Sequence, residues 1–197
     1  MSIDTRRSAV LALHWQCNVI KPDGFFGAML AEPVARSGVI ERATHFHGAA
    51  QVVGLPVLFT RFTVPGDGGQ LVTNTAFMTA VAASRDAFAP DGPGARIIPE
   101  MAAQASPDRV FDNQKLSGLA GSTVPRWLAE HGIDTVLITG VATNLTVEQT
   151  ARHATDLGLT AYVIGDCVAA ADPAAHAASL ANLELTTAGC RTADQVL

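Results

Sequence analysis

The chain has 197 residues, of which 48% are hydrophobic and 16% charged, with a formal net charge of −5. This length is enough for one α/β domain with a sizeable core, and the composition excludes a disordered chain. Because the chain has no Lys/Arg run and no apolar run of the roughly 18 residues that a membrane span needs, we expect neither a nucleic acid nor a membrane as a partner.

The N-terminus and the cysteines both indicate a cytoplasmic location. Residues 1–7 lead directly into an apolar run, without the polar spacer and cleavage site of a signal peptide. Cys17, Cys167 and Cys190 cannot all pair and show no CxxC spacing, which is typical of free thiols in a reducing compartment.

The first half of the chain predicts two strands and a helix. An apolar run at residues 8–13 predicts the first strand, after which polar groups and an aromatic ring cluster at residues 14–18. A helix is expected at residues 41–53 and a second strand at residues 57–62. The glycine-rich break at residues 65–69 has no GxxxxGK[ST] pattern, so we interpret it as an active-site or interface loop.

Short strands and helices alternate in the second half of the chain. They are a strand at 109–111, a helix at 122–131, a strand at 133–139, a helix at 147–157, a strand at 160–164, a helix at 173–183 and a final short strand within 187–197. This alternation predicts a parallel sheet with helices on both faces. We therefore expect an α/β fold, a three-layer αβα arrangement with a mostly parallel central sheet, formed by residues 1–197 as a single domain.

The turn at residues 140–146 is the first candidate site. A strand that ends in a glycine turn and feeds a helix aims backbone N–H groups at one point, where ligands bind in open α/β sheets. The hydroxyl of Thr146 is its most exposed functional group. Threonine is also a common helix N-cap, so a structural role stays equally open at this stage.

Three segments of the chain carry a pattern that is known from one superfamily. They are Gly140-Val-Ala-Thr-Asn144 with the helix after it, the stretch Gly165 to His176, and a middle section with Gly92-Pro-Gly94, Ile98-Pro-Glu100, Ser117 and Thr123. Together they resemble the isochorismatase-like superfamily of cysteine hydrolases. The resemblance covers nearly the whole chain and implies the same three-layer fold.

The resemblance implies a catalytic site whose usual residues this chain replaces. Active members of the superfamily use an Asp after the first strand, a Lys in the middle and a Cys at the nucleophile turn, and these positions fall on His14, Asn113 and Thr146. We expect His14 to act as general acid/base and Asn113 to orient a neutral ligand. Thr146 is either a hydrogen-bond donor or cap, which we favour, or a nucleophile. Lys115, two residues from the expected Lys, could partly replace it.

Further residues are expected to bind the substrate. They are Gln16, Cys17, Phe26, Phe62, Ala142 and Asn144. Cys17 is either an apolar wall or a relocated nucleophile. Backbone N–H groups from Ala142 to Thr146 would stabilise developing negative charge.

Neither a metal nor a cofactor is expected. The nicotinamidase branch of the superfamily has an Asp–His metal cluster after its second strand, but residues 61–67 lack the Asp-x-His spacing. His45 and His47 are expected to pack in the fold or at an interface, because two residues apart on a helix they face different directions.

The remaining histidines are interpreted as structural or surface residues. The resemblance gives His176 a structural role, in which it pairs with Asp166 or Asp172. His131 and His153 are expected at the surface.

Two functions from different classes fit these residues. The first is an enzyme for a small, neutral or aromatic molecule, either a divergent hydrolase or an acid/base enzyme without a nucleophile. The second is a catalytically silent ligand-binding or regulatory protein, because all three catalytic positions changed together. A hydrolase that depends on Cys17 is a third reading. The resemblance also implies a homodimer or homotetramer.

Overall fold

The computed structural model describes residues 3–197 and has one six-stranded parallel sheet at its centre. The strands are β1 (Ser8–Leu13), β2 (Val57–Phe62), β3 (Val110–Asn113), β4 (Thr135–Val141), β5 (Thr160–Ala169) and β6 (Cys190–Arg191), in the order β3-β2-β1-β4-β5-β6. Every neighbouring pair is parallel.

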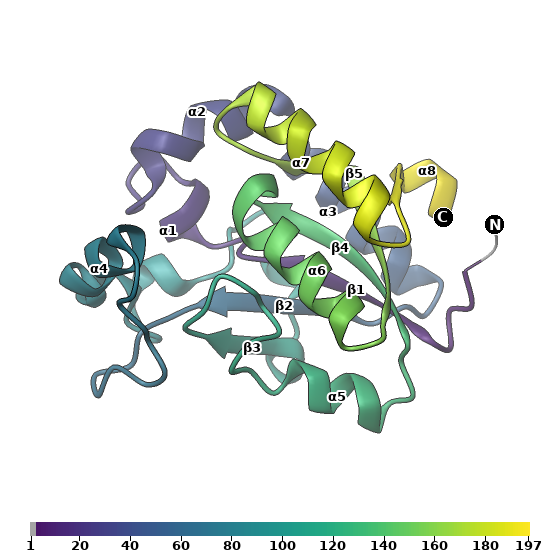
Figure 1. Cartoon of the computed structure of the whole chain (residues 1–197), viewed down its shortest axis with the longest axis horizontal. Coiled ribbons are helices and arrows are strands. Elements are labelled where there is room, and N and C mark those ends of the chain that lie inside the picture. Colours follow the sequence, from purple (N-terminus) through teal and green to yellow (C-terminus); the bar gives the residue numbers. More distant parts are fainter. Residues whose placement is uncertain (1–2) are drawn as a thin grey trace.

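Helices cover both faces of the sheet. They are α1 (Cys17–Ile20), α2 (Gly27–Ser37), α3 (Val39–Val52), α4 (Ala76–Ala83), α5 (Val124–Glu130), α6 (Glu148–Asp156), α7 (Pro173–Thr186) and α8 (Ala193–Val196). In Figure 1, α5, α6 and α7 lie on the near face, and α2 and α3 lie behind the sheet. The predicted α/β fold with a parallel sheet between two helical layers is confirmed.

The central strands are apolar because both of their faces are buried. In β1, Ala9, Leu11 and Leu13 pack into the core beneath α5 and α6, whereas Val10 and Ala12 pack into the core beneath α3. A strand covered on both sides needs a continuous apolar run rather than an alternating one. This explains why the run at residues 8–13 predicted the strand with its correct bounds.

Gly140 lets the two middle strands approach closely where they end. Its φ is 145°, and a Cβ at this position would lie 2.5 Å from the carbonyl oxygen of Leu13, its partner in β1. The chain of β1 continues into His14, and the chain of β4 continues into the candidate turn. These two segments therefore meet at the carboxyl edge of the sheet, where open α/β folds bind ligands.

The strand β5 is longer than predicted, and its pairing with β4 is irregular. β5 continues to Ala169, beyond the predicted end at Ile164, and the register between β4 and β5 shifts between Ile138 and Gly140. Asp166, which follows the predicted strand, lies within β5. Its carboxylate accepts a hydrogen bond from the backbone N–H of Ala193 at 2.9 Å.

Three helices beside the candidate site, α1, α2 and α4, were not predicted. α2 contains Pro33, a residue that normally interrupts a helical pattern, and α4 is a short helix capped by Thr75, whose Oγ1 accepts from the N–H of Met78 at 3.1 Å. The helix predicted at residues 147–157 is also preceded by a π-helical turn, Thr143–Val147.

His47 is a fully buried histidine between α3 and the sheet. Its Nε2 lies 2.9 Å from Thr139 Oγ1, its Nδ1 has no partner, and the rings of Trp15 and Phe59 contact it edge-on. Burial lowers the pKa of His47 to about 3, so the ring is neutral at pH 7. Of the two expected roles for His47, packing is the one observed.

The buried imidazole of His47 should make stability depend on pH. Below pH ~6.5 the unfolded chain protonates this histidine while the folded chain does not, so stability falls as the pH decreases toward 3. His47→Gln should reduce the slope of unfolding free energy against pH by about 1.4 kcal/mol per pH unit between pH ~4 and ~6. Urea denaturation at several pH values measures this slope.

His45 provides the matched control, because it is exposed on the same helix. His45→Gln should keep the wild-type slope. An unchanged slope in His47→Gln would contradict the neutral buried state of His47.

Candidate active site

His14 occupies the end of β1 with an unusual backbone. Its φ is 54°, in the left-handed region, and the side chain is only 6% exposed. The ring contacts Phe62 edge-on at 6.2 Å, and its Nε2 is enclosed without a hydrogen-bond partner. Burial lowers the pKa of His14 to about 4, so the imidazole is neutral at pH 7.

Asn113 ends β3 with its carboxamide held in one orientation. Its Nδ2 donates to the carbonyl oxygens of Lys115 at 2.9 Å and Ser117 at 2.7 Å, which uses both amide protons. Its Oδ1 is buried and has no partner. The amide favours the protonated form of His14 and so opposes part of the lowering of the His14 pKa by burial.

Thr146 lies in the π-helical turn, and its hydroxyl is already engaged. Oγ1 donates to the carbonyl oxygen of Leu116 at 2.6 Å. The proton is therefore used, and only the lone pairs of Oγ1 remain for a ligand. A nucleophilic role would first require this hydrogen bond to break.

A narrow apolar cavity lies at this edge of the sheet, and His14 and Thr146 both line it. The other walls come from α1, the start of α2, the end of β2, α4, Leu116 and the turn after β4. Within residues 3–197, no charged side chain lines it, and only about 40 Å³ of it is open to water-sized molecules. Ligand pockets are usually several hundred Å³, so a ligand must displace part of the wall.

Aromatic rings form the movable part of this wall. Phe26 and Phe77 are stacked, with their centroids 5.6 Å apart and their planes at 6°. Phe77 and Met29 are 36% and 43% exposed, so both can turn toward solvent. Neither Met29 nor Phe77 was predicted to line the site, because neither α2 nor α4 was predicted.

The structure brings together some of the predicted binding residues and not others. Phe26, Phe62 and Ala142 line the cavity with His14 and Thr146. Asn144 is exposed outside it.

Cys17 and Lys115 both lie away from the cavity. Cys17 lines a separate surface groove with Lys21 and Arg96, and burial raises the pKa of its thiol. Lys115 Nζ donates to the carbonyl oxygen of Gln70, so it points away from the position of the superfamily lysine.

Gln16 is fully buried and holds the backbone of Phe62 rather than facing the cavity. Its Nε2 donates to Phe62 O at 3.0 Å, and its Oε1 accepts from Phe62 N at 2.6 Å. This pair of hydrogen bonds ties the segment after β1 to the end of β2, and it fixes the place of the Phe62 ring in the wall.

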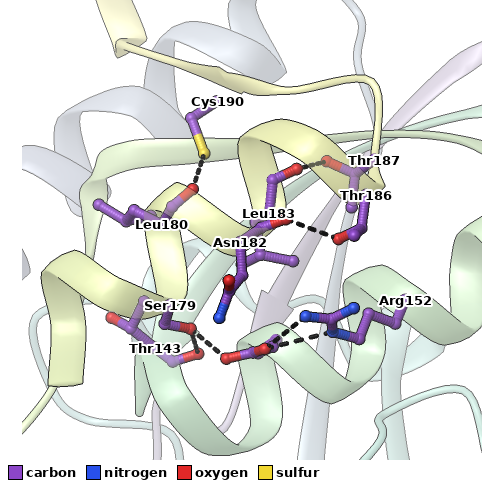
Figure 2. Close-up of polar contacts among 10 residues, drawn as sticks. Thr143, Arg152, Ser179, Leu180, Asn182, Leu183, Thr186, Thr187 and Cys190 are labelled. Atoms are coloured by element: carbon purple, nitrogen blue, oxygen red, sulfur yellow. Dashed lines mark hydrogen bonds and ion pairs between the residues drawn. The ribbon is translucent and has the colours of Figure 1, made fainter.

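The turn after β4 is held by a second layer of polar contacts. His176 Nδ1 lies 2.8 Å from Thr143 Oγ1, so its expected pairing with Asp166 or Asp172 is wrong; Asp172 instead caps α7 by accepting from Ala175 N. Figure 2 shows Ser179 of α7 meeting Thr143, and Ser179 Oγ also contacts Glu148. The turn is thus fastened to α7.

His153 is half-buried and not, as expected, at the surface. Its Nδ1 lies 2.9 Å from Ser117 Oγ, while His131 is exposed and stacks on Trp127. The contact with Ser117 helps to hold the segment whose carbonyl groups bind Asn113 and Thr146.

Neither a metal centre nor a membrane span is found in the described part of the chain. No group of three or more His, Cys, Asp or Glu side chains in residues 3–197 could hold a metal ion. No helix there is long and apolar enough to cross a bilayer.

The role of Gln16 leads to a stability prediction. Gln16→Ala should lower the free energy of unfolding by about 3 kcal/mol, because it leaves the buried N–H and C=O of Phe62 without partners. Gln51→Ala is the control: Gln51 is exposed and donates to Gln104 O, and its loss should cost less than about 1 kcal/mol. Urea unfolding measures the stability loss of each variant. Equal losses would contradict the stabilising role of the two hydrogen bonds between Gln16 and Phe62.

The chain is similar in sequence to known proteins. A family model described as the isochorismatase domain matches residues 8–195. The isochorismatase family protein YwoC of Bacillus subtilis (strain 168) is 30% identical over 103 residues, 52% of this chain and 54% of YwoC. A nicotinamidase of Acinetobacter baylyi is 46% identical over 61 residues, 31% of this chain and 26% of that enzyme. The matches thus span about half or less of these curated relatives.

Solved structures show the same fold over almost the whole chain. A cysteine hydrolase from Pseudomonas syringae pv. phaseolicola 1448A has a TM-score of 0.85 at 20% identity, covering 99% of this chain and 92% of that one. A pyrazinamidase/nicotinamidase from Streptococcus mutans UA159 has a TM-score of 0.74 at 20% identity, covering 93% and 99%.

Proposed function

Because the chain belongs to the isochorismatase family, we propose that it is a divergent enzyme that acts on a small organic molecule by acid–base catalysis through His14. Asn113 and Thr146 assist it in place of the usual catalytic residues. The observation that carries this proposal is a neutral imidazole, buried beside Asn113, that lines an apolar cavity at the carboxyl edge of the sheet.

Asn113 sets which nitrogen of His14 is the base. Both protons of the Asn113 amide are committed to carbonyl oxygens, so Oδ1 can only accept. Neither the enclosed Nε2 of His14 nor Asn113 Oδ1 has another partner, so we assign the ring proton to Nε2, where Oδ1 can accept it, and the free lone pair to Nδ1. A partner that fixes the tautomer of a catalytic histidine in this way is a common arrangement in enzymes.

The neutral state of His14 favours the role of a base in the first step. At pH 7 the imidazole holds no extra proton, so Nδ1 can take one from the substrate or from a water molecule beside it. Once protonated, the buried ring is more acidic than an ordinary imidazolium and returns the proton to the product. Negative charge that develops on the substrate would face the first N–H groups of the helical segment that begins at Thr143.

Hydrolysis is one reaction class that fits this mechanism. The matched relatives include a nicotinamidase and a protein described as a cysteine hydrolase, whose printed names indicate hydrolytic activity. In this chain water activated by His14 would attack, because Thr146 has committed its proton to Leu116. The same base equally supports an isomerisation or a lyase reaction, neither of which needs a nucleophile.

Activity on a panel of esters, amides and enol ethers tests this proposal. The rate should rise with pH around the His14 pKa of about 4 and level off above it, because the neutral ring is the active form. His14→Gln should lower kcat/KM by about 100-fold or more, while His131→Gln, at an exposed histidine, should not. A bound ligand without turnover would support the ligand-binding alternative instead.

Asn113→Asp tests the link between the two side chains. A carboxylate beside the ring stabilises imidazolium, so the pKa of His14 and the midpoint of the pH–rate profile should both rise by at least about one unit. Long-range ¹H–¹⁵N spectra of the histidines measure the pKa and the tautomer directly. A wild-type ring protonated at Nδ1, or a midpoint that does not move, would contradict the assigned role of Asn113.

A further inference from the structure

The polar side chains at the site have used the protons that they could donate, so they can only accept hydrogen bonds from a ligand. Asn113 has given both amide protons to Lys115 O and Ser117 O, and Thr146 has given its hydroxyl proton to Leu116 O. Three successive carbonyl groups thus consume the donors of both side chains. What these side chains offer to a ligand in the cavity is the lone pairs of Thr146 Oγ1 and the free nitrogen of His14.

Three basic side chains have partners outside the cavity. Arg61, in β2, forms two hydrogen bonds with Asp112 at 2.7 and 2.8 Å. Lys115 reaches the carbonyl oxygen of Gln70, and Lys21 pairs with Glu100 at 2.5 Å. None of these cations lines the cavity, so a carboxylate that entered it would lose its water without gaining an opposite charge.

The walls favour a flat apolar ring. Phe26 and Phe77 already lie parallel at the mouth, and an aromatic or alicyclic ring can take the place of Phe77 against Phe26 when Phe77 turns to solvent. Leu145, Val141 and Val81 complete an apolar surface around the inserted ring.

We propose that the substrate is a small uncharged molecule with an apolar, ring-shaped body and one O–H or N–H group that donates to His14, and that carboxylates are excluded. This inference rests on the proposed function in one respect: it takes this cavity as the substrate site. It goes further by stating what the cavity accepts and what it rejects.

Three probe molecules of similar size test the hydrogen-bond donor and the exclusion of charge separately. Phenol is neutral and donates a hydrogen bond, toluene is neutral without a donor, and benzoate is charged. Each is titrated into the protein at pH 7 while the methyl resonances of Leu145, Val141 and Val81 are followed by NMR, with exposed Leu185 as the remote reference. Phenol should shift the cavity methyls saturably and bind about tenfold more tightly than toluene, and benzoate should leave them unchanged.

Two variants assign the selectivity to named side chains. His14→Leu should remove the preference for phenol over toluene, because the acceptor is lost while the apolar walls stay. Phe77→Lys, at the partly exposed mouth, should admit benzoate by supplying a cation. Leu185→Lys, which adds the same charge on an 86% exposed position of α7, should not.

The outcomes distinguish this inference from the proposed function. Benzoate binding at the cavity methyls of the wild-type protein, or no saturable binding of phenol there, overturns the inference. Turnover that depends on His14 but occurs only on carboxylates also overturns it, and leaves acid–base catalysis standing. Phenol binding with the stated selectivity supports the inference even where His14→Gln leaves turnover unchanged, a result that would contradict the proposed function alone.

Discussion

The close contact between β1 and β4 at their carboxyl ends is the constraint on which the rest of the site depends. Leu13 and Gly140 pair in register, and the space for a side chain at Gly140 is taken by the Leu13 carbonyl group. Because the strands meet so closely, the residue after one strand and the turn after the other share a single small space. His14 and Thr146 then line the same cavity, although they are far apart in the sequence.

Burial in an apolar environment explains the chemistry of both enclosed histidines. A charged imidazole loses its hydration inside the protein, and burial lowers the pKa of His14 to about 4 and that of His47 to about 3. The two rings differ in what surrounds them. His47 is packed between aromatic rings and meets Thr139, which suits a structural role, whereas His14 lines a cavity and has Asn113 beside it. The same physical effect therefore keeps both rings neutral, one packed in the core and the other beside a cavity, where we propose that it acts as a base.

The sequence allowed the central strands and part of the site to be predicted, for physical reasons that particular residues show. Strands buried on both faces leave continuous apolar runs, so β1 and β2 were found with their bounds. α2 was missed because Pro33 interrupts its pattern, and its cavity residue Met29 was missed with it. The direction of a side chain could not be read from its position: Gln16 turns to Phe62, and Lys115 turns to Gln70. Such directions depend on partners distant in the sequence.

The strip of carbonyl groups at residues 115–117 also limits how the chemistry of this chain could change. A cysteine placed at position 146 would bring its sulfur against the Leu116 carbonyl oxygen, which now accepts the Thr146 proton. The negative end of that dipole repels a thiolate, and the neighbouring amide of Asn113 supplies no positive charge to offset it. A nucleophilic cysteine here would have to turn its sulfur away from the Leu116 carbonyl oxygen, toward the direction that the Thr146 methyl group now takes. The conversion therefore depends on the rotamer of the residue at position 146 as well as on its identity.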